Sequence, residues 1–117
     1  VTNFSYPWGE VFLPHHSNLL GEEDGHLFSA PVGSFQSGSS ASGVMDMAGN
    51  VWEWVDPKKS ERPQPETRIV KGGGWTSNEK QARISFRNHV NLKMKNPTFG
   101  FRCTKSLVKE KGNRAEN

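Results

Sequence analysis

The sequence of 117 residues has one cysteine, Cys103, and few aliphatic side chains. A single cysteine excludes an internal disulfide, and a hydrophobic fraction of 32% gives a thin core for one domain. The chain contains no apolar run near the length of about 20 residues that a transmembrane helix requires. We therefore expect one domain at most, with no membrane span.

Aromatic residues, glycine and proline are common in this chain, in contrast to cysteine and aliphatic residues. Seven Phe, four Trp and one Tyr supply the bulk for a core, while twelve Gly and seven Pro disfavour long helices. Segments 82–88 and 99–103 alternate in polarity, which is typical of strands. These features predict an α+β, loop-rich fold with short antiparallel strands and one short helix near residues 77–81. Alternation also puts Cys103 on the face of Phe99 and Phe101, which predicts a buried, inert thiol.

The formal charge of +3 is concentrated at the C-terminus. Residues 105–117 contain four basic and two acidic side chains, and so carry +2 of the total. We interpret residues 105–117 as a basic flexible tail and residues 1–104 as the folded domain. Because the domain itself has no basic stripe interleaved with aromatic residues, we expect no nucleic-acid partner.

The stretch DMAGNVWEW, residues 46–54, is the most informative motif. Two tryptophans flank Glu53 directly after a Gly-Asn turn. From the residues alone, Trp52 and Trp54 form one face of a buried strand, Asp46 caps a turn and Glu53 is a solvated strand residue.

Six segments together carry a resemblance to a known family. In chain order they are PWG, APVGSF, GVMDMAGNVWEWV, RIVKGGGW, RISFRN and FGFRC. This series, from Tyr6 to about Thr104, resembles the C-terminal half of the formylglycine-generating enzyme, or sulfatase-modifying factor, family. The resemblance implies a C-type-lectin-like fold. Because whole family domains are about twice as long, it also implies a fragment, or a partner chain that supplies the N-terminal half.

The resemblance implies two calcium sites with oxygen ligands, which calcium prefers. At the first, Asp46 and Glu53 would supply side-chain oxygens, and Gly49 and Val51 carbonyl oxygens. At the second, the ligands would be the side chains of Asn18 and Asp24 and the carbonyls of Leu19 and His26. The alternative for the second set is a plain acidic surface loop.

Members of the family that oxidise a sulfatase cysteine use two active-site cysteines and copper. The residues of this chain that match those cysteines are Ser77 and Ala82, and neither can supply a thiolate. Thr98 replaces an asparagine that lines the family's active site. The resemblance therefore makes copper binding and formylglycine formation by this chain improbable, and leaves open whether the chain is part of an enzyme.

We interpret the chain as a non-catalytic, calcium-stabilised module for ligand or protein binding, in an extracytoplasmic setting where calcium is plentiful. The alternative is a fragment of a formylglycine-generating or related metal-dependent oxidoreductase whose catalytic residues lie outside this chain. Related sulfoxide synthases hold iron through histidines contributed mainly by another domain. In other relatives the region matching Thr76 to Pro97 binds ligands, and its polar candidates here are Arg83, Arg87, Asn88, His89, Asn91 and Asn96. The alternative is that Arg87 and Asn88 brace loops through hydrogen bonds and that the others are ordinary surface residues.

Overall fold

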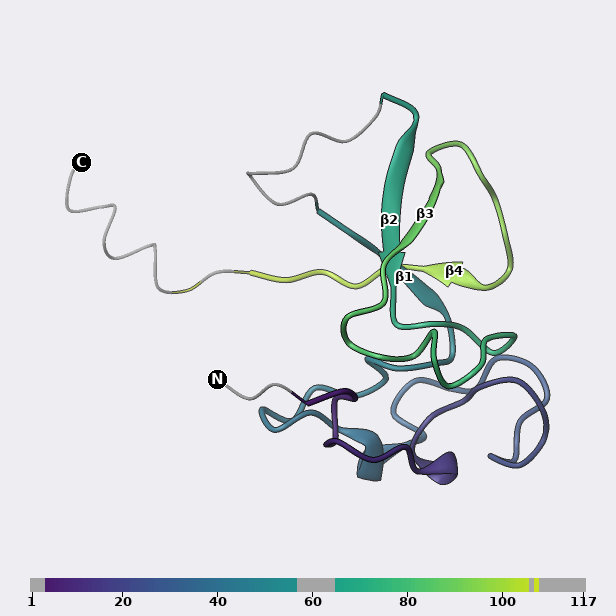
Figure 1. Cartoon of the computed structure of the whole chain (residues 1–117), viewed down its shortest axis with the longest axis vertical. Helices are drawn as coiled ribbons and strands as arrows, with labels where there is room; N and C mark the ends of the chain where they lie inside the picture. Colours follow the sequence, from purple (N-terminus) through teal and green to yellow (C-terminus); the bar gives the residue numbers. More distant parts are fainter. Residues whose placement is uncertain (1–3, 57–64, 106, 108–117) are drawn as a thin grey trace.

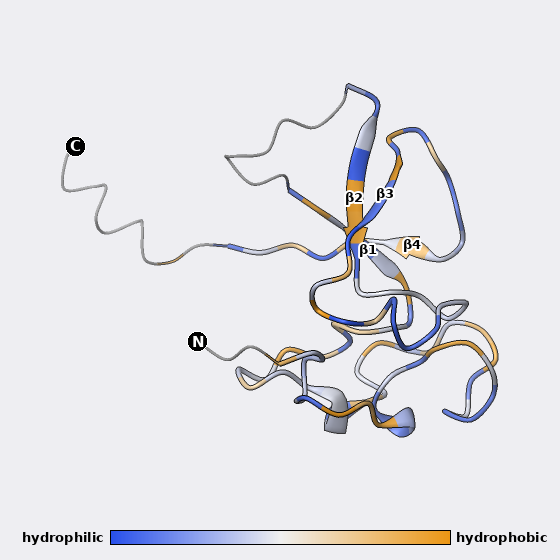
Figure 2. Ribbon diagram, viewed as in Figure 1, coloured by the Kyte–Doolittle hydropathy of each residue, from blue (hydrophilic) through white to orange (hydrophobic). Residues whose placement is uncertain are grey.

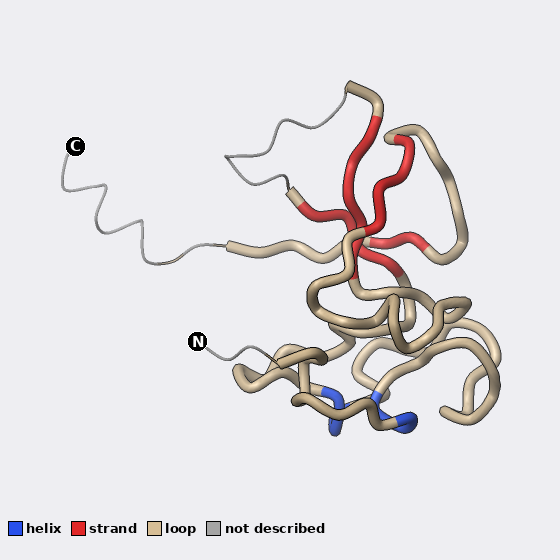
Figure 3. The backbone as a smooth tube through the Cα atoms, in the orientation of Figure 1, coloured by secondary structure: helices blue, strands red, loops and turns tan. Residues whose placement is uncertain are grey.

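The computed structural model describes residues 4–56, 65–105 and 107, and most of them lie in loops (Figures 1 and 3). Two single-turn 3-10 helices, η1 (Pro14–His16) and η2 (Gln36–Gly38), contact each other in the N-terminal half. Four short strands follow: β1 (Trp52–Val55), β2 (Thr67–Lys71), β3 (Asn88–Asn91) and β4 (Phe99–Gly100). The prediction of a loop-rich fold with short strands is confirmed.

The four strands form one sheet in the order β3-β2-β1-β4. β2 pairs antiparallel with both β1 and β3, in a register that places Trp54 opposite Val70. β4 pairs parallel with β1 and so differs from the predicted antiparallel arrangement. The reason is the connection through residues 92–98, which carries the chain from β3 at one edge of the sheet to the other edge beside β1 (Figure 1).

Two small apolar clusters form the core of the described residues. One lies on the sheet, where Trp52, Val70 and Val90 are buried and Trp54, Phe86 and Phe99 pack around them. The second lies among the loops and consists of Tyr6, Leu19, Ala48 and Ala82, with Trp8 and Phe12 packed against it. Figure 2 shows the apolar stretches of β1 and β2 where the strands meet. Aromatic rings thus supply much of the packing, as the composition indicates.

Asn50, in the Gly-Asn turn, connects three segments of the chain, those of Asn18, Ala30 and Trp75, by hydrogen bonds. Its Oδ1 accepts hydrogen bonds from the Ala30 N–H at 2.8 Å and from Asn18 Nδ2 at 3.1 Å. Its own N–H donates to the Asn18 carbonyl at 2.8 Å, and its carbonyl accepts from the Trp75 N–H at 2.9 Å. Because Asn50 is buried, these bonds satisfy polar groups that water cannot reach. The turn therefore fixes the loop of Asn18 and the start of the segment after β2.

The helix predicted near residues 77–81 is replaced by a series of turns. The Asn78 side chain accepts a hydrogen bond from the Gln81 N–H at 3.0 Å, and the following amides donate to carbonyls three residues earlier. Such i to i+3 bonds belong to tight turns, and Asn favours them through its side chain. Within the described parts of the chain, the only helices are the two 3-10 turns, and none is long and apolar enough to cross a membrane.

Two predictions from alternation were wrong. The strand predicted over residues 82–88 is not formed: Ile84 lies in a turn and is 46% exposed, and β3 begins only at Asn88. Cys103 is exposed, and Phe101 is 76% exposed. β4 ends at Gly100, so the residues after it have no neighbouring strand whose face could bury them. Of the predicted tail, only Lys105 and Leu107 lie among the described residues, and the boundary at residue 104 stays a prediction.

Candidate functional site

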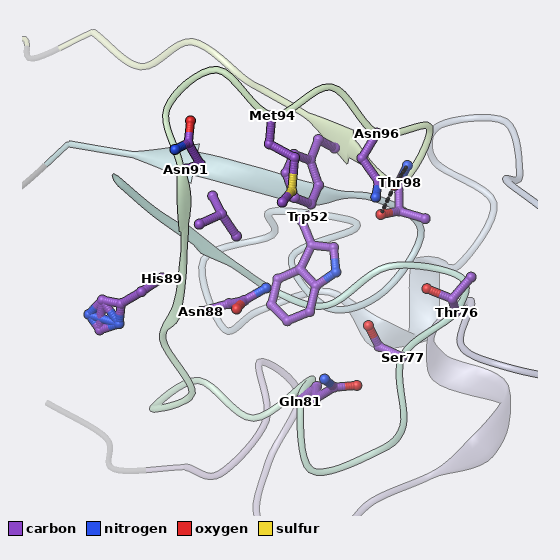
Figure 4. Close-up of a pocket in the computed structure, with 12 residues that line it drawn as sticks. Trp52, Thr76, Ser77, Gln81, Asn88, His89, Asn91, Met94, Asn96 and Thr98 are labelled. Carbon is purple, nitrogen blue, oxygen red and sulfur yellow. Dashed lines mark hydrogen bonds between the residues drawn. The ribbon is translucent and has the colours of Figure 1, made fainter. Parts of the chain in front are cut away.

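A pocket of about 460 Å³ opens beside the sheet where β1, β3, β4 and the glycine-rich segment, residues 72–77, meet. Its lining residues are Trp52, Thr76, Ser77, Gln81, Asn88, His89, Val90, Asn91, Met94, Asn96, Thr98 and Phe99. Figure 4 shows the indole of Trp52 in the middle of the labelled side chains, while the His89 imidazole points away from it. The volume is within the usual range for small-molecule sites, about 300–1,000 Å³.

The polar lining of this pocket carries no permanent charge. Amide and hydroxyl side chains supply most of the hydrogen-bonding groups, together with the His89 imidazole. The lining residues include no carboxylate, amine or thiol, and the Ser77 oxygen already accepts a hydrogen bond from the Gly74 N–H. The arrangement can therefore bind a ligand through hydrogen bonds and contact with an aromatic wall.

Four of the six polar candidates from the sequence line this pocket: Asn88, His89, Asn91 and Asn96. Arg83 instead lines a separate groove, with Pro7 and Ile84. Gln81 lines the pocket without being among these candidates, and Trp52, expected in the core alone, is 5% exposed and also faces the pocket. The Asn-x-x-Gln spacing of Asn78 and Gln81 predicts the turn that these two residues close by reciprocal hydrogen bonds, but it does not show that Gln81 faces the pocket.

Ser77 and Ala82, at the positions of the family cysteines, have structural contacts. Ser77 is 2% exposed, and its Oγ accepts a hydrogen bond from the Gly74 N–H at 2.9 Å. Its carbonyl accepts from the Leu20 N–H at 3.0 Å, which ties the glycine-rich segment to the second predicted calcium loop. Ala82 is 1% exposed and packs in the core cluster of Tyr6 and Leu19. Ser77 therefore stabilises a wall of the pocket, while Ala82 belongs to the core.

Thr98, in the place of the family's active-site asparagine, closes a turn before β4. Its hydroxyl and its N–H both donate to Asn96 Oδ1, at 2.7 and 2.8 Å. Its carbonyl accepts from the Trp52 N–H at 2.6 Å. Both hydrogen bonds to the Asn96 oxygen therefore come from Thr98, within the pocket wall. The Thr98 carbonyl connects this wall to β1.

The residues of the first predicted calcium site surround the Gly-Asn turn. Asp46 Oδ2 accepts a hydrogen bond from the Gly33 N–H at 2.7 Å, and both Glu53 oxygens accept from Arg102. The Gly49 N–H donates to the Gly72 carbonyl at 2.7 Å, and Val51 packs beside Gly100. The structure brings Asp46 and Glu53 together through a guanidinium group. Calcium binding by these four residues stays a prediction.

The residues of the second predicted site form a closed loop. Asp24 accepts hydrogen bonds from the Leu19 N–H at 2.8 Å and from the His26 N–H at 3.0 Å, one with each carboxylate oxygen. Asn18 is fully buried, and its Nδ2 donates to the Phe28 carbonyl at 2.8 Å as well as to Asn50. Its Oδ1 is buried with no hydrogen-bond partner.

The Asn18 oxygen is the one observation that fits a cation at the second set. A buried carbonyl-type oxygen without a donor is costly, and a hard cation such as calcium would satisfy it. Among residues 4–56, 65–105 and 107, no three His, Cys, Asp or Glu side chains come together as metal ligands. A metal site of the described residues would therefore need amide or carbonyl oxygens beside its carboxylates, and such oxygens suit calcium better than copper or zinc.

Comparison with known proteins agrees with the resemblance seen in the sequence. The chain is 30% identical over 122 residues to the serine/threonine-protein kinase pkn1 of Chlamydia caviae, covering 92% of this chain and 19% of the kinase. It is 30% identical over 120 residues to the inactive C-alpha-formylglycine-generating enzyme 2 of Bos taurus, covering 92% of this chain and 39% of that protein. Hercynine oxygenase of Mycobacterium tuberculosis is 37% identical over 99 residues, which cover 71% of this chain and 23% of the oxygenase.

Among solved structures, PvdO from Pseudomonas aeruginosa is similar to this chain, with a TM-score of 0.68 and 29% identity. The match covers 84% of this chain and 42% of PvdO, so the chain spans less than half the length of each of these proteins. The sequence model of the sulfatase-modifying factor enzyme 1-like domain matches residues 2–107. Because that match takes in nearly the whole sequence, the chain belongs to the sulfatase-modifying factor enzyme 1-like domain family.

Proposed function

We propose that this chain is a non-catalytic binding module of its family, with a C-type-lectin-like fold, whose pocket beside Trp52 takes an uncharged ligand. The observation that carries the proposal is the neutral polar lining of that pocket, with Ser77 and Ala82 at the positions of the family cysteines. The similarity to a relative named as an inactive formylglycine-generating enzyme points the same way.

The ligand class follows from the lining groups. Amides and hydroxyls both donate and accept hydrogen bonds, and an aromatic wall contacts the apolar face of a ligand. A charged ligand would lose its hydration without gaining a counter-ion from the pocket, which is costly. Hydroxyl-rich saccharides and uncharged peptide segments have the required chemistry.

Changing Asn91 to aspartate is the sharpest test of the pocket. Asn91 Oδ1 accepts a hydrogen bond from the Lys93 N–H at 2.8 Å, and an aspartate oxygen can keep that bond. The change therefore removes the amide donor and adds a charge while preserving the turn. We expect binding to weaken about tenfold, which corresponds to about 1.4 kcal/mol. The measurement is ¹H–¹⁵N NMR titration with uncharged oligosaccharides and end-capped peptides, read at the side-chain amides of Asn88 and Gln81.

Asn78→Asp is the matched control, because Asn78 lies outside the pocket lining and its Oδ1 likewise accepts a backbone N–H. It should leave the titration unchanged. Saturable binding of acidic or basic counterparts in preference to the uncharged probes, or equal loss in both variants, would contradict the proposed ligand class.

The second part of the proposal is that calcium stabilises the module at the loop of Asn18, Leu19, Asp24 and His26. The support is the unpartnered Asn18 Oδ1 in a loop that Asp24 already holds closed. An ion that binds the folded state alone raises stability by RT ln(1 + [L]/Kd).

We also propose that a partner chain, or a further part of the same protein, contacts this domain. The support is the apolar surface of the described residues. Phe4, Val44, Met47 and Ile84 line an open groove of about 420 Å³, and each is more than a third exposed. Exposed apolar patches of this kind commonly mark interaction surfaces.

The second candidate function, part of a metal-dependent oxidoreductase, is favoured by the similarity to hercynine oxygenase. A direct assay separates the two candidates. Incubated with copper, a reductant, oxygen and a peptide that carries a sulfatase-type cysteine, the chain should produce no formylglycine detectable by mass spectrometry, because Ser77 and Ala82 provide no thiolate. Turnover that appears on adding an iron- or copper-binding partner chain would favour the oxidoreductase.

A further inference from the structure

Arg102 joins three segments of the chain that are far apart in sequence. Its Nε donates to Glu53 Oε1 at 2.6 Å, and its Nη2 donates to Glu53 Oε2 at 2.8 Å. Nη2 also donates to the Asp46 carbonyl at 2.9 Å. One guanidinium group therefore links the segment after β4 to β1 and to the loop that precedes the Gly-Asn turn.

This contact has the geometry of a strong ion pair. Two parallel N–H donors meet the two carboxylate oxygens, and the third contact makes use of the fixed shape of the guanidinium. The Arg102 side chain is 35% exposed and that of Glu53 20% exposed, so water screens the pair only in part. A guanidinium group is protonated at every working pH, so Arg102 keeps its positive charge in this pair.

The same residues are those predicted to bind calcium at the first site. As placed, the Glu53 carboxylate and the Asp46 carbonyl accept hydrogen bonds from Arg102, and Asp46 Oδ2 accepts from Gly33. A calcium ion in this set would share its ligands with a guanidinium at hydrogen-bond distance, where two positive charges repel. The first set therefore does not fit the ion.

We propose that the Arg102 guanidinium replaces calcium at the first set, as a built-in cation that binds Glu53 and the Asp46 carbonyl. The turn around Gly49 is then stabilised without a metal, and the calcium dependence of the module comes from the second set alone. This inference concerns the pairing of Arg102 and stands apart from the proposed ligand pocket.

The test is thermal unfolding, followed by circular dichroism in millimolar calcium and in excess chelator. Arg102→Gln and Glu53→Gln should each lower Tm by about 5 °C or more relative to wild type, and by the same amount in both buffers, because each breaks a metal-independent pair. Arg102→Lys, which keeps the charge but loses the paired donors, should fall between Arg102→Gln and wild type. Arg83→Gln and Glu22→Gln change the same charges at exposed positions and should move Tm by a degree or less.

Calcium titration by calorimetry keeps the inference testable if Arg102→Gln fails to fold. The wild type and Glu53→Gln should bind calcium with the same stoichiometry and affinity. If Glu53→Gln loses a bound ion, or loses the rise in Tm with calcium, the inference is overturned and the first set is a calcium site. If wild type shows no calcium dependence, only the calcium proposal for the second set fails, and equal losses in both buffers would still support Arg102 as the internal cation.

Discussion

Gly49→Ala is expected to cost about 3 kcal/mol or more of folding free energy, because the added methyl group meets both backbone strain and a steric clash. Gly49 has φ +79°, where a residue with Cβ is strained by about 1–2 kcal/mol. The added Cβ would also lie 2.5 Å from the Asn18 carbonyl oxygen and 2.9 Å from its nitrogen. Both are backbone atoms that cannot rotate away, and the oxygen accepts a hydrogen bond from the Asn50 N–H of the turn at 2.8 Å. The measurement is the free energy of unfolding from denaturant titration followed by circular dichroism.

Gly43→Ala is the matched control, since Gly43 has φ +87° and an added Cβ there meets no atom within 4 Å. It carries the backbone strain without the collision and should cost about 1 kcal/mol. The difference between the two variants isolates the close approach of the turn to Asn18. Equal costs at the two positions would mean that the loop of Asn18 is not held against the turn.

The sequence could predict features that depend on residues close together in the chain. The Gly-Asn pair predicts a turn because both residues adopt positive φ readily, and the structure has φ +79° and +69° there. Trp52 and Trp54 predict a strand through their alternation, and both lie on β1. Asn88, Asn91 and Asn96 were candidates only through the resemblance to the family, and all three line the pocket. The oxygens of Asn91 and Asn96 also brace local turns, a structural role of the kind that the sequence left open.

Contacts between distant segments could not be predicted from the sequence. Arg102 and Glu53 are 49 residues apart, and no local pattern pairs a C-terminal arginine with that strand. Asn18 lies in a polar stretch typical of an exposed loop, yet it is fully buried, because the Asn50 side chain and the Phe28 carbonyl reach it from other segments. Cys103 was predicted to be buried from alternation alone, but alternation has no meaning where β4 stops after two residues.

The second large effect is expected at Asn18. With chelator present, both Asn18→Asp and Asn18→Ala should lose about 3 kcal/mol of stability, because each removes the two Nδ2 hydrogen bonds at a fully buried position. The aspartate adds the cost of a buried carboxylate, and the alanine adds a cavity. With millimolar calcium the two variants should separate. The carboxylate is a better calcium ligand than the amide it replaces, so the Tm of Asn18→Asp should rise by more than that of wild type.

The alanine variant has no oxygen at this position and should keep its low Tm in both buffers. The same titration on Asn78→Asp, an exposed position where the side-chain oxygen accepts a backbone N–H, controls for the added charge and should follow wild type. If calcium stabilises Asn18→Ala as much as wild type, Asn18 is not a ligand, and its unpartnered oxygen has another explanation. If it stabilises Asn18→Asp most and Asn18→Ala least, the buried oxygen binds the ion. The module would then depend on calcium through this loop and on Arg102 at the turn beside it, so that two cations of different origin stabilise a chain with a thin core and one cysteine.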